Sequence, residues 1–326
     1  MIVSNDTIVS KPPYNISVKV LELIKSISER IGEINAFHLD ATSPKLRKQS
    51  RIKTLHSTLA IEGNTLTKSQ ITALIENKRI IGPEKDITEV LNAERVYKNL
   101  NSFQPFNESS YLEAHKMLMN GLIKNPGNYR RQQIGIIKGK IVKHAAPPYK
   151  NVPYLMKDLF AYLKNSEDLI LIKSCVFHYE MEFIHPFLDG NGRMGRLWQT
   201  LILMGEYPVF EFLPFETLIS KEQETYYAVL AECDKLGHST LFIEYMLDIL
   251  NKSLEEILNF SNRTFNQQQR LEYFVSMGKS SFARKDYMSV FNNISSATAS
   301  RDLKEGIRQE LFEKIGEKNN TIYRLK

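Results

Sequence analysis

The chain has 326 residues, 42% of them apolar and 25% charged, which is the composition of an ordinary soluble protein with a good core and room for more than one domain. No apolar run approaches the roughly 20 residues of a membrane-spanning helix, and the first 15 residues lack the apolar stretch of a secretory signal. We therefore expect a cytoplasmic protein that contacts no membrane, with Cys175 and Cys233 as reduced core residues.

Charge is distributed unevenly along the chain. The net charge is +6, and residues 263–326 hold 12 Lys and Arg against 7 Asp and Glu, which leaves about +1 for the first 262 residues. A basic tail beside a nearly neutral body favours a separate role for the tail, for example in binding DNA.

Apolar residues at helical spacing predict a mainly helical N-terminal region after an irregular arm. Ser109 or Ser110 would open the last helix of this region, and Gly121 would close it. The predicted elements are the arm over 1–15 and helices over 16–40, about 46–62, 69–80, 86–100 and 109–122.

The helix that ends near residue 62 carries a carboxylate in an unfavourable place. Gly63 looks like its C-terminal cap, so Glu62 occupies its last turn, where unpaired carbonyls carry partial negative charge. We therefore expect the Glu62 carboxylate to pair with a cation from another part of the fold.

The pattern changes near residue 133. β-Branched residues on both sides of a Lys-Gly-Lys turn predict a short β-hairpin over about 133–144, ended by Pro147 and Pro148. A lone hairpin is marginal by itself, so we expect it to present backbone groups to another molecule. Helices are predicted again over 154–165, 168–187, 195–206, 221–234 and 241–260, and the second of these is apolar around much of its circumference.

The tail has an element order of its own. Helices over 267–278, 283–292 and 295–309 precede two strands within 311–326 that are joined by a turn at 318–320. Three helices, the third capped by serine, followed by a β-wing are the order of a winged helix-turn-helix. A small packing domain that touches no DNA is the alternative.

Residues 185–196, HPFLDGNGRMGR, combine several chemical groups between two helices that are predicted to be buried. His185 is a base that is neutral near pH 7, and Asp189 is a hard oxygen ligand suited to Mg²⁺. The following helix start would bind an anion, and Arg193 and Arg196, three residues apart, share a helix face. Together these groups indicate phosphoryl or nucleotidyl transfer.

This stretch resembles the complete signature of the Fic family, H-x-F-x-[DE]-G-N-G-R-x-x-R, and the resemblance extends over about 109–260, including "GNYR". Fic proteins are typically ATP-dependent protein adenylyltransferases, which move AMP onto a Ser, Thr or Tyr hydroxyl, although some relatives use other nucleotides or transfer phosphocholine or phosphate. Their fold is an all-α bundle with a β-hairpin flap. The resemblance thus implies a mainly α, Fic-type helical bundle with ATP and Mg²⁺ at its site.

The resemblance also implies a role for each residue of the signature. His185 would be the catalytic base, Phe187 would anchor the loop, and Asp189 would hold Mg²⁺. The implied nucleotide-binding residues are Asp189, Gly190, Asn191, Gly192, Arg193, Met194, Gly195 and Arg196, with Arg196 on the γ-phosphate. The hairpin residues Val142, Lys143, His144 and Ala145 would clamp a target segment over the nucleotide, and Tyr226 and Tyr227 resemble the family's adenine-pocket tyrosines.

The odd glutamate belongs to the same resemblance. Thr58, Glu62 and Gly63 match the family's inhibitory motif, [S/T]-x-x-x-E-[G/N], in which the Glu pairs with the second arginine, here Arg196, and displaces the ATP γ-phosphate. The motif lies N-terminal to the Fic core, which is the arrangement for inhibition within one chain. Glu62 would thereby lie at the nucleotide site as well.

The sequence predicts three regions: an N-terminal helical region with the inhibitory helix over 1–108, a Fic core over 109–262 and a winged-helix-like domain over 263–326. The preferred function is an auto-inhibited protein adenylyltransferase that acts on an unknown target protein or on itself. The alternatives are a nucleotide-sensing regulator that binds DNA through 263–326, and a hydrolase that removes AMP at the same site. Members of the family often self-associate, so a homodimer is also expected from the resemblance.

Overall fold

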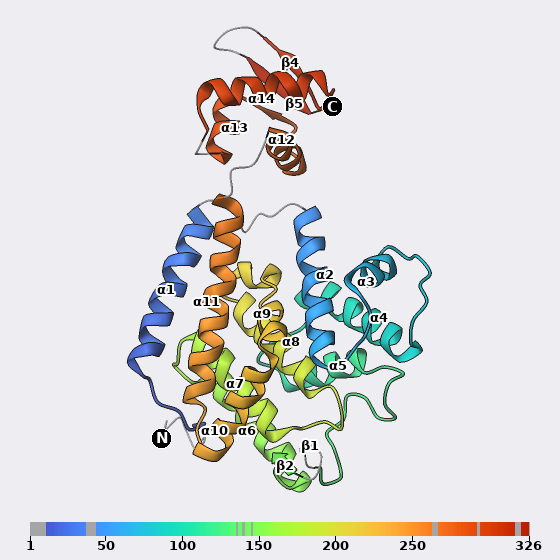
Figure 1. Ribbon diagram of the computed structural model, residues 1–326. Helices are drawn as coiled ribbons and strands as arrows, with labels where there is room; N and C mark the ends of the chain where they lie inside the picture. The colour runs from blue at the N-terminus through green and yellow to red at the C-terminus, as the bar shows by residue number, and fades with distance from the viewer. Residues whose placement is uncertain are drawn as a thin grey trace. The chain divides into compact units, whose positions relative to one another are not determined.

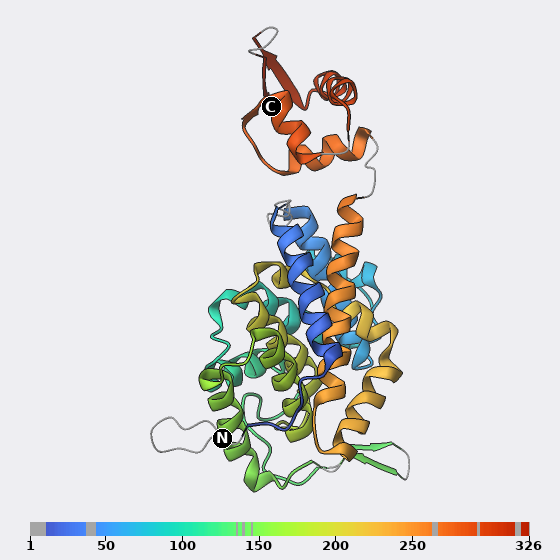
Figure 2. The same cartoon turned by 90° about the vertical axis from the view of Figure 1, so that its left-hand side faces the viewer.

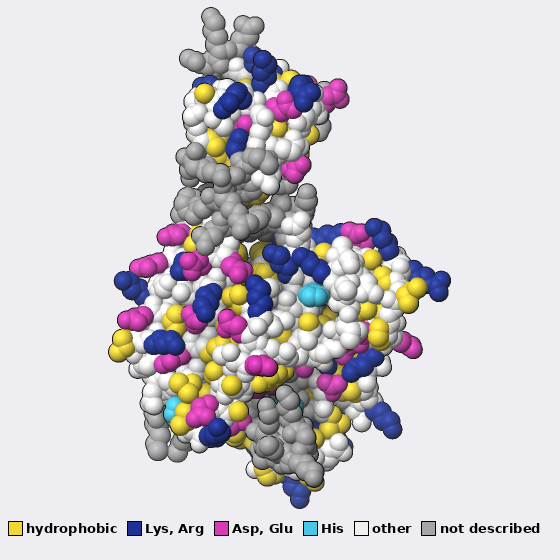
Figure 3. Space-filling model, in the orientation of Figure 1, with side chains coloured by type: hydrophobic (Ala, Val, Ile, Leu, Met, Phe, Trp, Pro, Cys, Tyr) yellow, Lys and Arg dark blue, Asp and Glu magenta, His cyan; other side chains and the backbone are white. Residues whose placement is uncertain are grey.

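The computed structural model describes residues 11–36, 44–134, 136–138, 141–144, 146–262, 267–291, 294–316 and 321–325 (Figure 1). The chain forms two compact units, which we term the larger unit (Met1–Ile31 and Ser50–Glu255) and the smaller unit (Gly32–Gln49 and Glu256–Lys326). The fold is mainly helical, as predicted, and no helix among the described residues is long and apolar enough to cross a membrane. Figure 3 shows basic and acidic side chains interspersed on the visible face of each unit.

Most of the predicted helices are present up to residue 262, with changes at their ends. Asn107 caps α5, because its side-chain oxygen accepts the N–H groups of Ser109 and Ser110, so this helix begins at Glu108 and not at either serine. The helices are α1 (Val18–Ala36), α2 (Pro44–Ile61), α3 (Lys68–Ile75), α4 (Glu84–Lys98), α5 (Glu108–Leu118), α6 (Val152–Asn165), α7 (Ile170–Ile184), α8 (Asn191–Met204), α9 (Glu216–Lys221), α10 (Gln223–Leu236) and α11 (Thr240–Asn262), with 3-10 turns at Leu100–Ser102, Tyr149–Asn151 and Pro208–Phe212.

Helices α7 and α8 pack against each other at the centre of the larger unit (Figure 1). Tyr111 of α5 fills the space beside them, with its ring centroid 6.0 Å from that of Phe177 and 5.0 Å from that of Trp198. The Trp198 indole donates to the Pro105 carbonyl at 2.8 Å, so its polar group is satisfied inside the core. The apolar circumference of α7 is therefore buried, as its sequence predicted.

The described part of the N-terminal arm lies along α11 without forming a helix until Val18. The Asn15 N–H donates to Thr240 Oγ1 at 2.9 Å, and the Ser239 N–H donates to the Pro13 carbonyl at 2.9 Å. Further along α1, Arg30 Nε donates to the Asn251 side chain at 2.8 Å. The arm and the part of α1 up to Arg30 are thus hydrogen-bonded to α11 within the larger unit.

Strands β1 (Ile136–Lys138) and β2 (Ile141–His144) pair antiparallel, which is the hairpin predicted from the sequence (Figure 2). Ile137 pairs with Val142 and Lys138 with Ile141, and the register shifts between Ile136 and Ile137. Strand β2 contacts α10, so the hairpin lies beside the helix that carries Tyr226 and Tyr227. Residue Ala145 of the predicted clamp lies outside the described residues.

From residue 267 onwards, the described residues of the smaller unit form three short helices and a three-stranded antiparallel sheet of order β3-β5-β4. Strand β3 was not predicted, because two residues carry no alternating pattern. The elements are α12 (Gln267–Ser276), β3 (Ser281–Phe282), α13 (Arg284–Val290), α14 (Ser296–Arg308), β4 (Phe312–Ile315) and β5 (Ile322–Leu325).

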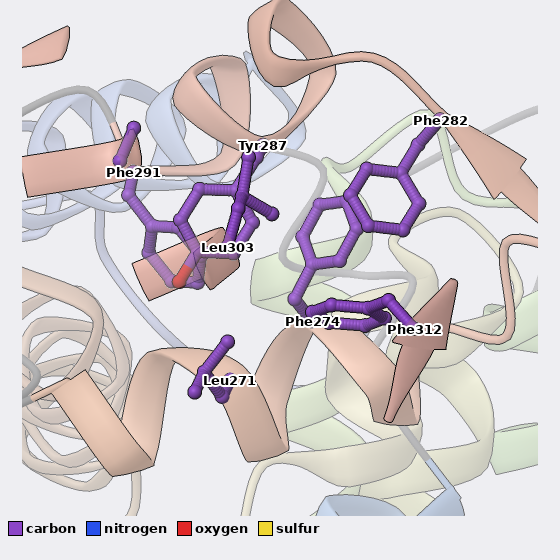
Figure 4. Close-up of a cluster of buried hydrophobic side chains, with 8 residues drawn as sticks. Leu271, Phe274, Phe282, Tyr287, Phe291, Leu303 and Phe312 are labelled. Atoms are coloured by element: carbon purple, nitrogen blue, oxygen red, sulfur yellow. The ribbon is translucent and has the colours of Figure 1, made fainter. Parts of the chain in front are cut away.

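One apolar cluster holds the smaller unit together (Figure 4). Phe274 of α12 lies with its ring centroid 4.5 Å from that of Phe282 and 4.9 Å from that of Tyr287. Gly306 of α14 leaves room for Phe312, because a Cβ at this position would lie 2.3 Å from the Phe312 ring. The cluster consists of Leu271, Phe274, Phe282, Tyr287, Phe291, Ala299, Leu303 and Phe312.

Candidate functional site

Two left-handed residues shape the loop between α7 and α8. His185 follows α7 with a φ of 50°, and its N–H donates to the Met181 carbonyl at 3.0 Å. Gly190 precedes α8 with a φ of 87°, and a Cβ there would lie 2.8 Å from Met119 Sδ. A non-glycine residue in this region costs about 1–3 kcal/mol, so the contacts around His185 must hold it there.

Asn191 and Phe187 lock the loop from inside. The Asn191 side chain accepts the Phe187 N–H at 2.9 Å and donates to the Phe187 carbonyl at 3.0 Å. The Phe187 ring is fully buried and stacks on His115 with the centroids 3.5 Å apart. Phe187 therefore anchors the loop in the core, and the amide of Asn191 is directed to the loop backbone.

His115 of α5 supports the loop from the opposite side. Its Nδ1 accepts the Gly127 N–H at 2.8 Å, so in the neutral ring Nε2 carries the hydrogen and donates to the Asp189 carbonyl at 3.1 Å. Burial lowers the pKa of His115 to about 4, which keeps the ring neutral near pH 7. The sequence did not indicate this residue, because a lone histidine on a helix fits an ordinary core position.

Helix α8 begins at Asn191, within the loop signature and four residues before the start predicted from the apolar pattern. Gly190 has no side chain to cap the helix, so N–H groups of the first turn remain available to an anion. Asp189 lies just before them: its Oδ1 accepts the Gly190 N–H at 2.6 Å, and its side chain is 44% exposed. The loop thus places an accessible carboxylate beside a helix N-terminus.

Arg193 is held between two carboxylates. Its Nη2 lies 2.9 Å from Asp189 Oδ1, and its Nη1 lies 3.0 Å from Glu89 Oε1 on α4. Glu89 also accepts from the Asn64 amide at 2.8 Å, so it is fixed by the turn after α2. Glu89 was not predicted, because one acid on an ordinary helix resembles a solvated surface residue.

Arg196 is fully buried and faces the end of α2. Its Nε donates to Thr58 Oγ1 at 2.9 Å, and its Nη2 donates to Glu62 Oε1 at 2.7 Å and to the Thr58 carbonyl at 3.1 Å. Burial by itself would lower the pKa of Arg196, but the nearby Glu62, Tyr226 and Glu182 together raise it above its ordinary value. The structure therefore brings Thr58 and Glu62 to Arg196, which lies 138 and 134 positions further along the chain.

The other guanidinium nitrogen of Arg196 points to the start of α8. Among the described residues Nη1 has no hydrogen-bond partner, and it would lie 3.0 Å from a Cβ built on Gly192. The same Cβ would lie 2.3 Å from Glu62 Oε1, so the carboxylate occupies space that only glycine leaves open. A buried donor without a partner beside a helix N-terminus is suited to an anion.

The turn that carries Glu62 is closed by a Schellman motif. Gly63 has a φ of 88°, its N–H donates to the Ala60 carbonyl at 3.0 Å, and the Asn64 N–H donates to the Leu59 carbonyl at 3.1 Å. From α10, Gln223 Nε2 donates to the Ile61 carbonyl at 2.7 Å. The backbone of this turn is therefore well satisfied, while the side chain of Glu62 extends to Arg196.

Tyr226 and Tyr227 occupy different environments on α10. The Tyr226 hydroxyl is buried, 3.0 Å from His178 Nε2 and 3.5 Å from Glu182 Oε1. The Tyr227 ring is 42% exposed, and burial together with the nearby Glu62 carboxylate raises its pKa. Of the two predicted adenine-pocket residues, only Tyr227 presents an exposed ring next to Glu62.

Arg130 connects the loop with the segment after the hairpin. Its Nε donates to the His185 carbonyl at 2.8 Å, and its Nη2 donates to the carbonyls of Pro147 at 2.6 Å and Ile184 at 3.3 Å. Its own N–H donates to the Pro186 carbonyl at 2.8 Å. The only sequence signal for this role was the fragment "GNYR", which ends at Arg130.

The remaining predicted nucleotide-binding residues lie in strand β2 or in the core. Val142, Lys143 and His144 form the strand that pairs with β1. Met194 is fully buried, and a Cβ at Gly195 would lie 2.7 Å from the His178 ring, so α8 packs closely on α7 at these two positions.

Comparison with known proteins places this arrangement in a family. The family model described as Fic/DOC matches residues 105–203. The crystal structure of a Fic family protein from Desulfovibrio desulfuricans G20 is 38% identical, with a TM-score of 0.76 over 97% of this chain and 98% of that chain. This chain belongs to the Fic family.

Curated relatives of this Fic protein share lower identity. The protein adenylyltransferase fic-1 of Caenorhabditis elegans is 27% identical over 252 residues, which are 73% of this chain and 47% of that protein. The protein adenylyltransferase Fic of Drosophila erecta is 24% identical over 245 residues, 71% of this chain and 47% of that protein. The chain thus spans about half the length of these relatives, and a solved C. elegans Fic-1 structure (22% identity, TM-score 0.62, 74% and 72% coverage) shares its fold.

Proposed function

We propose that this Fic protein transfers AMP from ATP to a Ser, Thr or Tyr hydroxyl of a target protein or of itself, and that Glu62 inhibits the transfer. The observation that carries the proposal is the meeting of a base, an accessible carboxylate and two arginines at one helix N-terminus: His185, Asp189, Arg193 and Arg196. The names of the curated relatives point to the same chemistry.

The loop provides the groups that accept the proton and stabilise the charge in the transfer step. The attacking hydroxyl oxygen forms a bond to the α-phosphorus of ATP while His185 takes the hydroxyl proton. The bond between the α-phosphorus and the oxygen that bridges to the β-phosphate breaks, and pyrophosphate leaves with that electron pair. Arg193 and the N–H groups at the start of α8 stabilise the charge on the phosphates.

Asp189 fits a role in holding Mg²⁺ together with a nucleotide. Its carboxylate is partly exposed, and the described residues contain no cluster of three His, Cys, Asp or Glu that would hold a metal ion without other ligands. Mg²⁺ is commonly held by one or two carboxylates plus substrate phosphates and water, which matches a single Asp189. When bound, the ion would neutralise phosphate charge during the transfer.

Glu62 would inhibit by occupying the arginine that the γ-phosphate needs. Its carboxylate accepts a hydrogen bond from Arg196 Nη2, and Oε1 lies against Gly192 at the first turn of α8. A phosphate and a carboxylate are alternative partners for the same guanidinium. ATP would therefore bind in a productive orientation only after Glu62 leaves Arg196.

The hairpin would hold the target. Strands β1 and β2 form a two-stranded sheet, to whose edge an extended segment of another protein would add by main-chain hydrogen bonds. Arg130 ties the segment after the hairpin to His185 through the Pro147 and His185 carbonyls. This connection would set the distance between a bound hydroxyl and the catalytic base.

The experiment is AMP transfer from ATP labelled at the α-phosphate, with Mg²⁺, by the full chain. We expect weak labelling by the wild type, strong labelling by Glu62→Gly and none by His185→Ala. Glu62→Gln serves as a matched control, because it keeps the side-chain size and removes only the charge, and it should show intermediate labelling. Unchanged labelling in Glu62→Gly would refute inhibition by Glu62, and release of AMP from a labelled target would reveal the reverse reaction.

A second candidate function is DNA binding by a winged helix in the smaller unit, favoured by the exposed face of α14. Along one side of this helix the exposed residues are small or basic, with Ala297, Arg301 and Lys304 in one stripe. Ser295 caps the helix by accepting the Thr298 N–H at 3.1 Å. Small residues at the start and basic residues further along allow a helix to enter the major groove and contact phosphates.

Binding of the full chain to a mixed-sequence duplex DNA at several salt concentrations tests this second function. Replacing both Arg301 and Lys304 by Ala should weaken binding and reduce the slope of log K against log salt by about 2. Lys98→Ala is the control, because Lys98 is an exposed base of the larger unit, paired with Glu94 at 2.7 Å on α4. Absence of binding at low salt, or an equal loss in the control, would exclude DNA binding by this face.

A further inference from the structure

Two acceptor groups of Glu182 face one ring nitrogen of His185. The Glu182 carbonyl lies 3.3 Å from His185 Nδ1, and the Glu182 carboxylate oxygen Oε2 lies 4.0 Å from the same nitrogen. The Glu182 side chain is 12% exposed and the His185 side chain is 18% exposed, so this interaction is partly shielded from water. An N–H on Nδ1 would donate to the Glu182 carbonyl, and the carboxylate would attract it electrostatically.

The second carboxylate oxygen of Glu182 lies against a buried polar chain. Tyr226 hydroxyl lies 3.5 Å from Glu182 Oε1 and 3.0 Å from His178 Nε2, and His178 Nδ1 lies 2.7 Å from Gln199 Oε1. Gln199 Nε2 donates to Cys175 Sγ, which assigns its oxygen as the acceptor and the Nδ1 hydrogen to His178. Burial lowers the pKa of His178 to about 3, so this ring stays neutral and its Nε2 accepts from the Tyr226 hydroxyl.

We infer that Glu182 is a positioning residue for His185: with its carbonyl and carboxylate both facing Nδ1, it keeps the hydrogen on that nitrogen and leaves Nε2 as the base for the attacking hydroxyl. The inference rests on the proposed function, because it assigns a support to the proposed catalytic base. The carboxylate also stabilises the imidazolium that forms when Nε2 takes the hydroxyl proton.

Other charged and titratable groups surround this pair on neighbouring elements. Arg196 of α8 and Tyr111 of α5 both interact electrostatically with Glu182, and Arg130 donates to the His185 carbonyl. Arg196 is a cation near Glu182, and a nearby cation favours the charged form of a carboxylate. A negative Glu182 at the C-terminal end of α7 then adds to the negative end of the helix dipole beside His185.

The experiment uses Glu182→Gln in the full chain, which keeps the shape of the side chain and removes its charge. The midpoint of His185 titration is followed by NMR of ¹⁵N-labelled histidine without nucleotide, with the spectrum of His185→Ala for assignment. We expect the midpoint to move to lower pH in Glu182→Gln and to stay in place in the control Glu180→Gln, whose carboxylate neighbour is Asp234. An unmoved midpoint in Glu182→Gln would overturn the inference.

Activity supplies the second measurement, in the Glu62→Gly background. Glu182→Gln should lower kcat for AMP transfer about tenfold or more, as expected for loss of general-base efficiency, with little change in KM for ATP. Glu182→Asp should restore part of the loss. If the titration midpoint moves but no variant transfers AMP, the proposed function fails while the positioning of His185 stands; if KM alone changes, Glu182 acts on nucleotide binding and the inference is wrong.

Discussion

Gly192 and Glu62 share one space, which allows the inhibitory ion pair to be tested without changing Arg196. A Cβ at Gly192 would lie 2.3 Å from Glu62 Oε1, so Gly192→Ala must drive the carboxylate away from Arg196 Nη2, where it now lies at 2.7 Å. Gly192 is part of helix α8 and has no positive φ, so alanine is favourable for the backbone itself. The substitution is thus harmful mainly through Glu62, since Arg196 Nη1 would lie at 3.0 Å from the added Cβ.

The expected magnitudes follow from two opposing terms. Loss of the charge-assisted bond between Arg196 and Glu62 costs about 1.5–3 kcal/mol, and alanine in place of glycine in a helix returns about 0.5–1 kcal/mol. Gly192→Ala should therefore destabilise the wild type by about 1–2 kcal/mol. In the Glu62→Ala background the same change should stabilise by about 0.5–1 kcal/mol, because Arg196 Nη1 needs to shift by only a few tenths of an ångström.

The assay is denaturant unfolding of the wild type, both single variants and the double variant. Fluorescence of the single tryptophan, Trp198 in α8, reports on the larger unit alone. The double-mutant cycle should give a coupling energy of about 2 kcal/mol with a reversal of sign for Gly192→Ala. If Gly192→Ala destabilises equally in both backgrounds, Glu62 does not occupy the space beside Gly192 and the inhibitory contact is wrong.

Three further predictions test other parts of the structure. Burial raises the pKa of Glu216 from 4.5 to about 7, so the folded protein binds a proton that the unfolded chain releases, and the wild type loses stability as pH rises over this range. Glu216→Gln lacks this titration. Its unfolding free energy, measured by fluorescence, should therefore rise by about 1–3 kcal/mol relative to that of the wild type between pH 5 and pH 8. The Asn191 amide donates to the Phe187 carbonyl at 3.0 Å, and Asn191→Asp would replace this donor with a carboxylate. The variant should therefore lose about 1–3 kcal/mol of unfolding free energy in the same assay. Asp302→Asn breaks the buried pair with Arg270, at 2.6 Å, and should destabilise the smaller unit by about 3 kcal/mol in circular dichroism while the Trp198 transition stays unchanged.

The central part of the site was predictable because its members are adjacent in the chain. His185, Asp189, Arg193 and Arg196 lie on one loop and the helix that follows, so their spacing alone brings them together. The helix end at Glu62 was predictable from Gly63, whose positive φ closes the turn. Its partner Arg196 came from the resemblance to the Fic family, since no local pattern connects two residues 134 positions apart.

The supporting residues were not predictable, because their roles depend on tertiary contacts. Glu89 and His115 look like ordinary helix residues until the fold brings them to Arg193 and to the Asp189 carbonyl. Glu182 lies one turn before His185, but its role depends on the left-handed backbone of His185, after which Nδ1 faces both the Glu182 carbonyl and its carboxylate. Tertiary contacts of this kind leave no signal in residue type or periodicity.

AMP transfer by Glu62→Gly compared with the Glu62→Gly/His185→Ala double variant tests the central claim most directly. Each protein is incubated with ATP, Mg²⁺ and a cell lysate, and mass spectrometry measures AMP on tyrosine, serine and threonine residues. The proposed function predicts AMP-modified proteins with Glu62→Gly and none with the double variant. Equal modification by the two proteins, or none by either while both remain folded and bind ATP, would contradict it.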